Sequence, residues 1–326
     1  MLIELAEQCL VPDAVIRAGI RRLLSERLTQ ESRNPQSQPK AFAEWMRTQP
    51  IAVDTSAANE QHYEVPAEFY RLCLGPRLKY SSGYWPRGVK TLAESEEAML
   101  RLTCERAELM DGQRILELGC GWGSLTLWMA EQYPSAQIVA MSNSHSQREF
   151  ILQSAAERGF ANIEVRTANI AEFDPGGQFD RVVSVEMFEH VRNYELLLRR
   201  ISNWLTPAGR LFVHVFCHQR LAYPFEVAGA KDWITKHFFS GGVMPSFGLL
   251  REFPNDLQLE KEWWLYGDHY ARTCNSWLAK LDSNRSHSPL TRRQTQRWRM
   301  FFMACAELFA YDYGAQWGVG HFLLRC

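Results

Sequence analysis

The sequence predicts an α/β fold with a mostly parallel sheet covered by helices, and three observations support this prediction. Between residues 91 and 216, short apolar segments alternate with amphipathic segments, a pattern that requires crossover connections between parallel strands. A glycine-rich turn follows the first of these strands, where such folds bind ligands. A final strand candidate follows a long helix near the end of the chain, and we expect it to return antiparallel to the sheet edge.

The composition is that of a globular protein without a strong overall charge. The chain has 326 residues, of which 46% are hydrophobic and 22% charged, and its net charge is -1. This balance provides no field that would attract nucleic acid or an anionic membrane. No apolar run approaches the roughly 20 residues that cross a bilayer, and the eight cysteines form no Cys-x-x-Cys pair. We therefore expect a cytoplasmic protein with no nucleic-acid partner and no stable membrane insertion.

The predicted elements begin with a helical extension. Apolar residues recur at helical spacing from Val15 to Leu28, and a second short helix is expected from Phe42 to Met46 after a polar loop. The core elements then follow in a regular order: helix 91–109, strand 114–118, helix 124–132, strand 137–141, helix 146–158, strand 163–166, strand 181–185, helix 194–204 and strand 210–216. Residues 218–296 break this rhythm, and we expect them to form an irregular inserted lid. A helix at 298–309 and a strand at 317–324 complete the chain.

The turn after the first core strand has the composition of a ligand-binding loop, since Glu117 precedes Gly119-Cys120-Gly121-Trp122-Gly123. Glycine lets the backbone turn sharply and approach a ligand, because there is no Cβ in the way. The spacing differs from the Gly-x-Gly-x-x-Gly of dinucleotide-binding proteins, and no acidic residue follows the second strand to bind a ribose. A tight turn without a ligand is the alternative interpretation.

Three ionisable residues follow the strand at 181–185, and they are the predicted catalytic residues: Glu186, Glu189 and His190. The carboxyl ends of parallel strands form the edge where open α/β sheets bind ligands. The alternative is structural: the two glutamates cap the following helix and His190 packs beneath it.

The string Leu-Glu-Leu-Gly-Cys-Gly-Trp-Gly at 116–123 resembles the cofactor loop of class I S-adenosylmethionine-dependent methyltransferases. The resemblance is greatest to the group that contains cyclopropane fatty acid synthases and coclaurine-type N-methyltransferases. Residues 61–70, 79–85, 185–194 and 302–322 are also similar to this group, so the resemblance covers nearly the whole chain. It implies a Rossmann-like sheet and S-adenosylmethionine as cofactor.

By this resemblance, nine residues bind the cofactor: Tyr80, Ser81, Glu117, Gly119, Gly121, Asn143, Gln147, Asn169 and Ile170. Polar caps and turns after strands would explain Asn143, Gln147 and Asn169 equally well. The order of the expected elements and the resemblance together divide the chain into four parts. These are a helical extension and cofactor cover (1–90), the cofactor-binding core (91–217), the substrate lid (218–296) and a C-terminal helix and strand that complete the core (297–326).

The resemblance further implies N-methylation of a small amine, cyclic or aromatic. An alkylammonium with a pKa near 10.4 leaves about one molecule in a thousand neutral at pH 7, and only the neutral form attacks. We therefore expect Glu189 or His190 to accept the proton, directly or through water, while the carboxylates attract the cation. Tyr63, His214 and Trp317 are predicted to line the substrate pocket.

Two alternative functions remain open at this point. Carbon methylation of an unsaturated lipid is one, although the Tyr-Ser-Cys string that resembles the bicarbonate pocket of the cyclopropane branch reads Tyr80-Ser81-Ser82 here. A non-catalytic module that only binds the cofactor is the other. A homodimer is a separate expectation about assembly and not an alternative function. We predict no metal site, because His214, Cys217 and His218 lie on one strand with no spaced partner pair elsewhere.

Overall fold

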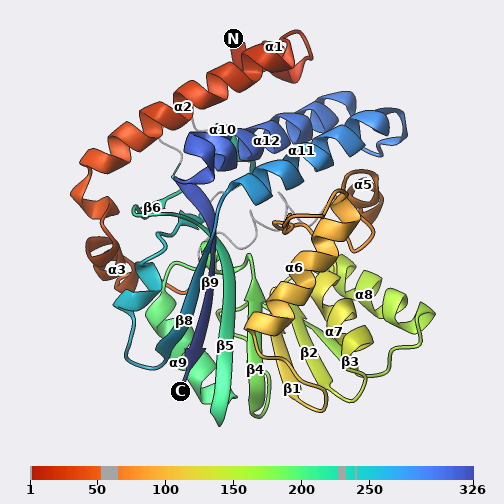
Figure 1. The fold of residues 1–326 in the computed structure, drawn as a ribbon, viewed down its shortest axis with the longest axis vertical. Helices are drawn as coiled ribbons and strands as arrows, with labels where there is room; N and C mark the ends of the chain where they lie inside the picture. The colour runs from red at the N-terminus through yellow and green to blue at the C-terminus, as the bar shows by residue number, and fades with distance from the viewer. Residues whose placement is uncertain (1, 53–64, 227–232, 239–240) are drawn as a thin grey trace.

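The computed structural model describes residues 2–52, 65–226, 233–238 and 241–326, and within these ranges its centre is a seven-stranded sheet (Figure 1). The strands are β1 (Arg114–Leu118), β2 (Gln137–Ser142), β3 (Ile163–Thr167), β4 (Phe179–Val185), β5 (Leu205–His218), β8 (Gln258–Leu265) and β9 (Trp317–Arg325). Their order is β3-β2-β1-β4-β5-β9-β8. The first five pair in parallel, and β9 runs antiparallel to both β5 and β8. The predicted mostly parallel sheet with an antiparallel last strand is confirmed.

Helices cover both faces of this sheet because its buried strands alternate apolar side chains between two cores. In β1, Ile115 packs with α6 (Leu92–Arg106) and α7 (Ser124–Gln132), whereas Leu116 and Leu118 pack with α3 (Pro39–Arg47) and α9 (Tyr194–Trp204). The helices are α1 (Leu2–Glu7), α2 (Asp13–Arg33), α3 (Pro39–Arg47), α5 (Ala67–Cys73), α6 (Leu92–Arg106), α7 (Ser124–Gln132), α8 (His145–Glu157), α9 (Tyr194–Trp204), α10 (Trp233–Phe238), α11 (Asp268–Ser283) and α12 (Arg292–Ala310). Short 3-10 turns and a small pair of strands, β6 (Tyr223–Pro224) and β7 (Val243–Met244), complete the described fold.

A helical layer lies over the carboxyl edge of the sheet, where α11 and α12 pack together and α2 crosses them (Figure 1). Ion pairs hold α2 to α12: Arg17 bonds Glu307 at 2.7 Å, and Arg299 bonds Asp13 at 2.6 Å. The first helices of the chain therefore support the layer above the site.

The expectation of an irregular segment at residues 218–296 was wrong for its second half. Residues Gln258–Leu265 form the sheet strand β8, and Asp268–Ser283 form the 16-residue helix α11. β8 is an edge strand, and its charged residues Glu260, Lys261 and Glu262 conceal it from a search for apolar alternation.

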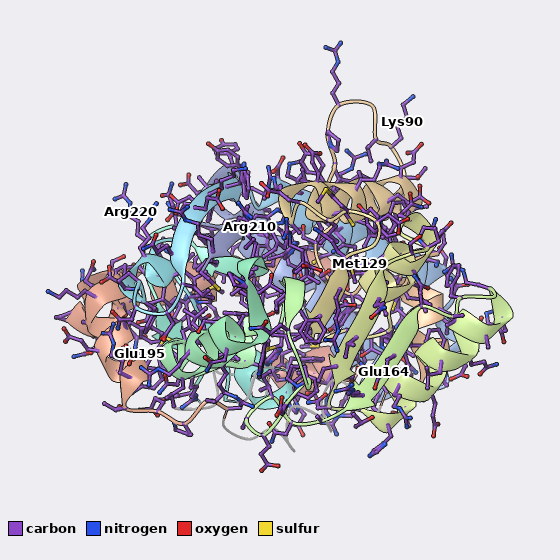
Figure 2. The ribbon with its side chains drawn as sticks, turned by 90° about the horizontal axis from the view of Figure 1, so that it is seen from below. Lys90, Met129, Glu164, Glu195, Arg210 and Arg220 are labelled. Atoms are coloured by element: carbon purple, nitrogen blue, oxygen red, sulfur yellow. The ribbon has the colours of Figure 1, made fainter. Side chains whose placement is uncertain are left out.

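Figure 2 shows the side chains on the ribbon, seen from below. Lys90 and Arg220 extend outward, whereas Met129 is fully buried against the sheet. In the parts of the chain that the structure describes, no helix is long and apolar enough to cross a membrane.

Candidate active site

A pocket lies at the carboxyl ends of β1, β2 and β4, in front of the glycine-rich loop. All nine residues predicted to bind the cofactor line it: Tyr80, Ser81, Glu117, Gly119, Gly121, Asn143, Gln147, Asn169 and Ile170. Two of the three predicted catalytic residues, Glu186 and His190, line it as well. The structure thus gathers these residues around one space, although the binding role of each stays a prediction.

Gly119 and Gly121 of the glycine-rich loop differ in what a side chain at each position would meet. Gly119 has a φ of +82°, and a Cβ there would lie 2.8 Å from the Cβ of Met187. Gly121 has a φ of +51°, but a Cβ there would meet no protein atom within 4 Å. Because Gly121 lines the pocket, a Cβ would point into open space that a ligand can use. The missing side chain at Gly121 therefore fits the close approach of a cofactor.

Below the loop, the carboxyl group of Glu117 accepts a 2.5 Å hydrogen bond from the hydroxyl of Thr126. Burial raises the pKa of Glu117 to about 7, against the opposing effect of that hydrogen bond. Glu117 can therefore gain or lose a proton near neutral pH while it faces the pocket.

The polar residues after β2 and β3 also have local structural roles, as the alternative interpretation proposed. Asn169 accepts a hydrogen bond from the backbone N–H of Ala171 at 3.0 Å, and Gln147 accepts one from the hydroxyl of Ser142 at 2.7 Å. Both side chains line the pocket at the same time. These bonds fix their orientation, so the structural role and the predicted binding role are compatible.

Glu186 stands at the centre of the acidic side of the pocket. Its carboxylate accepts a 2.6 Å bond from the hydroxyl of Tyr270 and a 3.2 Å bond from the backbone N–H of Ser82, and it lies 3.3 Å from Nε2 of His214. Its φ of +49° is strained for a non-glycine residue. Burial raises the pKa of Glu186 to about 7, opposed by the charge of Lys79. Contacts from three distant segments therefore hold an ionisable carboxyl group in the pocket.

Lys79 is a buried cation on the same side of the pocket as Glu186. Its ammonium donates a hydrogen bond to the hydroxyl of Ser81, and burial lowers its pKa to about 8, while the carboxylates of Glu186 and Glu96 oppose that shift. Lys79 is 3% exposed and lines the pocket. The pair of Lys79 and Glu186 thus places two groups that titrate near neutral pH on one side of the site.

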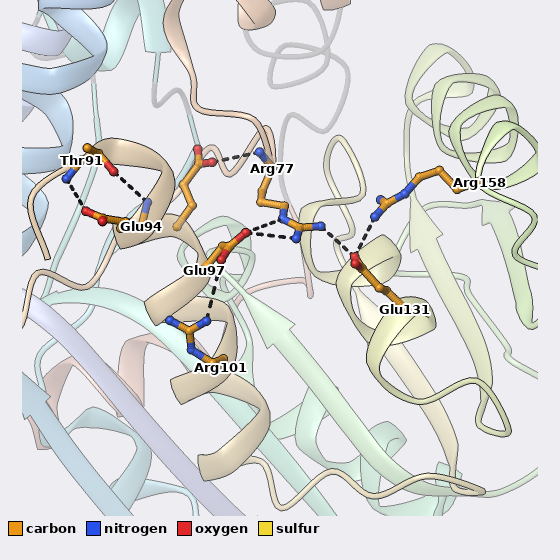
Figure 3. Close-up of polar contacts among 8 residues, drawn as sticks. Arg77, Thr91, Glu94, Glu97, Arg101, Glu131 and Arg158 are labelled. Atoms are coloured by element: carbon orange, nitrogen blue, oxygen red, sulfur yellow. Dashed lines mark hydrogen bonds and ion pairs between the residues drawn. The ribbon is translucent and has the colours of Figure 1, made fainter.

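The segment that carries Lys79 to Ser82 is fixed against two helices (Figure 3). Arg77 pairs with Glu97 of α6 at 3.1 Å and with Glu131 of α7 at 2.8 Å, and Arg158, the residue after α8, pairs with Glu131 at 2.7 Å. The backbone N–H of Arg77 donates to Glu96 at 2.9 Å. These bonds hold the segment in position against the pocket.

Glu189 and His190 lie on a short 3-10 turn after β4 and occupy different environments. Glu189 is 2% exposed, and within the described residues its Oε2 atom has no hydrogen-bond partner. Burial and the neighbouring Glu186 raise the pKa of Glu189 well above its usual range. His190 lines the pocket, whereas Glu189 does not. The alternative in which glutamates cap the next helix is wrong, because the side chain of Asn193 caps α9.

The three predicted substrate-pocket residues fall in three places. His214 is fully buried and reaches the site only through Glu186. Trp317 does not line the pocket at the glycine-rich loop: it is fully buried in the helical core, and its indole N–H donates to the hydroxyl of Tyr223 at 3.1 Å, so a role in a substrate pocket stays a prediction. The apolar ring and that buried partner explain its position. Tyr63 lies outside the described residues.

Two residues of the site had no assigned role in the sequence interpretation. Lys79 precedes the predicted Tyr80, but nothing in the sequence indicates that it is buried. Tyr270 lies in the segment that was expected to be irregular, and α11 brings it to Glu186. The signal that could have found Tyr270 is the helical spacing of the apolar residues in α11.

The sheet order, the glycine-rich loop and the acidic pocket define a class I S-adenosylmethionine-dependent methyltransferase. Residues 52–317 match the family model described as mycolic acid cyclopropane synthetase, and the chain belongs to this family. It uses S-adenosylmethionine as its cofactor.

Named relatives and solved structures agree with this assignment. The chain is 36% identical to (S)-coclaurine N-methyltransferase of Thalictrum flavum subsp. glaucum, over 99% of this chain and 95% of the relative. It is similar to the crystal structure of a coclaurine N-methyltransferase bound to N-methylheliamine and SAH, with a TM-score of 0.94, 35% identity and coverage of 100% and 99%. The cyclopropane synthase MmaA2 of Mycobacterium tuberculosis gives a TM-score of 0.74, 25% identity and coverage of 85% and 99%.

Proposed function

We propose that this enzyme methylates the nitrogen of a small cyclic or aromatic amine, and that Glu186 and His190 handle the proton of that amine. The observation that carries the proposal is the placement of an ionisable carboxyl group and an imidazole in the same pocket as the glycine-rich loop. Relatives that match nearly the whole chain are named as N-methyltransferases of coclaurine and pavine, which supports nitrogen as the acceptor atom.

The cofactor supplies a methyl carbon that its sulfonium has already activated. The chain must align the nitrogen with this carbon and exclude water, and alignment of this kind contributes about 7 to 11 kcal/mol. The carboxylate of Glu186 attracts an ammonium ion and accepts one proton from it, which leaves the nitrogen lone pair free to attack. Because burial raises the pKa of Glu186 to about 7, that carboxyl group is a stronger base than an exposed one.

Glu189 is a weaker candidate for the same step. Its side chain is buried and does not line the pocket, and burial and the neighbouring Glu186 raise its pKa well above the usual range, which disfavours its carboxylate form. We therefore assign His190, and not Glu189, the role of a second proton acceptor in the pocket.

Mass spectrometry tests the proposal directly. The purified protein is incubated with S-adenosylmethionine and a panel of cyclic secondary amines, polyamines and unsaturated phospholipids. The expected product is an amine that has gained one methyl group. A methylene added to a lipid, with no amine modified, would overturn nitrogen as the acceptor. Cofactor binding without any product would favour the non-catalytic binding module.

A homodimer and a cytoplasmic location stay predictions from the sequence. We propose the amine as the small-molecule partner and no other stable partner for the reaction. Light scattering after gel filtration measures the mass of the particle, and a value near twice the 37.7 kDa of the chain is the result expected of a homodimer.

A further inference from the structure

Behind Glu186, a line of hydrogen bonds runs from the pocket to the periphery of the sheet. Nε2 of His214 lies 3.3 Å from Oε1 of Glu186, and Nδ1 of His214 lies 2.8 Å from Nε2 of His321. Nδ1 of His321 lies 2.9 Å from Nη1 of Arg106. The two histidines are direct partners across β5 and β9, and both are fully buried. The line therefore has four members and three contacts.

Arg106 determines the direction of every hydrogen bond in this line. A guanidinium group can only donate, so Nδ1 of His321 must accept and its Nε2 must carry the proton. Nδ1 of His214 then accepts from His321, and its own Nε2–H faces the Glu186 carboxylate. A protonated Glu186 that donated toward His214 would oppose this order, because two donors would then meet at one of the three contacts.

The surroundings keep both imidazoles neutral, which the directional order requires. Burial lowers the pKa of His214 well below its usual range, and the charges of Lys79 and Arg106 lower it further. Burial does the same for His321, with additional effects from His214, Arg106 and Lys79. Arg106 itself lies at the last turn of α6 and is held by Trp263 of β8, 4.8 Å from its ring centroid. Its donor end is therefore fixed.

We propose that Arg106, His321 and His214 form a one-way hydrogen-bond chain that holds Glu186 in its ionised, proton-accepting form, with Arg106 and His321 as positioning residues. The inference deepens the proposed function, since it rests on Glu186 as the proton acceptor. Because the chain ends on a group that cannot accept a proton, it is no exit route. The proton that Glu186 receives leaves through the pocket.

The tautomers of the two histidines provide a test that needs no substrate. Long-range proton–nitrogen correlation spectra are recorded on the full chain with ¹⁵N-labelled histidine, and the two rings are assigned from their absence in His214→Gln and His321→Gln. The expected result is that both rings are neutral Nε2–H tautomers at neutral pH. A Nδ1–H tautomer or an imidazolium at either position would overturn the proposal. This readout stays valid even if no amine is methylated, so the two proposals can fail separately.

A matched pair of substitutions at His321 tests the effect on Glu186. A glutamine amide can both accept from Arg106 and donate to His214, whereas leucine can do neither. His321→Gln is expected to keep the wild-type pH profile of kcat/KM. His321→Leu is expected to move the acid limb of the kcat/KM profile to higher pH by about one unit. The reason is that the carboxylate of Glu186 has a higher pKa when its hydrogen bond from His214 is weakened. Cofactor binding and the melting temperature confirm that each variant is folded.

Arg106→Met provides the second measurement if His321→Leu does not fold. Without the guanidinium of Arg106, Nδ1 of His321 no longer has to accept a hydrogen bond, so the Nδ1–H tautomer of His321 becomes populated. The acid limb of the kcat/KM profile then moves to higher pH, as in His321→Leu. An unchanged pH profile in a folded Arg106→Met variant would overturn the positioning role.

Discussion

The loop side and the acidic side of the pocket face the same space but are built in different ways. The loop side is continuous in sequence, because Glu117, Gly119 and Gly121 lie within five residues. Its shape is determined mainly by the backbone conformation of the glycines. The acidic side brings Glu186 together with Lys79, His214 and Tyr270 from four separate segments. This difference fits the proposed function, in which the loop side binds the cofactor and the acidic side binds the amine and accepts its proton.

Glu186→Gln should produce the largest effect on turnover. Removal of a proton acceptor costs typically 10²–10⁴-fold, and we expect kcat to fall by about that factor because the amide has no negative charge and cannot take the proton. Steady-state kinetics with the best amine of the panel measure it. Glu149→Gln, an exposed position on α8, is the matched control and should keep full activity. Near-normal turnover in Glu186→Gln would contradict the role of Glu186 as the proton acceptor in the reaction.

The pH dependence of kcat/KM sharpens the same comparison. Burial raises the pKa of Glu186 to about 7, and the proton-accepting form exists above that value, so activity should rise with pH through about 7. Below it, each pH unit should cost about tenfold. The profile is measured with two amines of different pKa, so that titration of the substrate can be separated. An acid limb that persists unchanged in Glu186→Gln would assign it to another group.

Substitutions at the glycines test the loop side. Gly121→Ala should weaken binding of S-adenosylhomocysteine by about tenfold or more, since its Cβ would enter the pocket. Gly159→Ala is the matched control: Gly159 also has a left-handed φ, of +71°, and open space around it, but it lies in an exposed turn and does not line the pocket. Both variants should carry a similar backbone strain of about 1 to 2 kcal/mol. Calorimetric titration measures the affinity for S-adenosylhomocysteine, and thermal melting measures the loss of stability. Equal affinities in the two variants would contradict the assignment of Gly121 to the cofactor site.

Gly119→Ala should differ from Gly121→Ala, because its Cβ would collide with Met187. Overpacking of this kind costs about 1–3 kcal/mol in addition to the backbone strain. We expect a lower melting temperature than for Gly121→Ala, measured on the cofactor-free proteins. Equal melting temperatures would show that the loop relaxes around both substitutions.

Arg77→Gln should give the smallest effect. Partly exposed ion pairs are worth about 0.2–1 kcal/mol each, and Arg77 makes two, with Glu97 and Glu131. We expect a loss of free energy of unfolding below about 2 kcal/mol and a modest rise in KM. Arg101→Gln is the control, because Arg101 reaches Glu97 at 3.8 Å without touching the segment that carries Lys79. A larger KM change in Arg101→Gln would contradict the role of Arg77.

The sequence predicted the loop side better than the acidic side, for a physical reason. Apolar strands and glycine positions are local signals, so β1, its loop and the predicted lining residues Asn143 and Ile170 could be placed around one site. The buried state of Lys79 and the contact of Tyr270 with Glu186 depend on tertiary packing. Strand β8 was missed because an edge strand tolerates charge on its open side.

Calorimetric titration of S-adenosylhomocysteine into the wild-type protein and into Glu186→Gln tests the division between the two sides most directly. The expected result is one saturable site with the same affinity in both proteins, although the variant has lost turnover. Loss of affinity in Glu186→Gln comparable with that in Gly121→Ala would contradict the separate roles of the two sides, and the absence of saturable binding in the folded wild type would contradict the site itself.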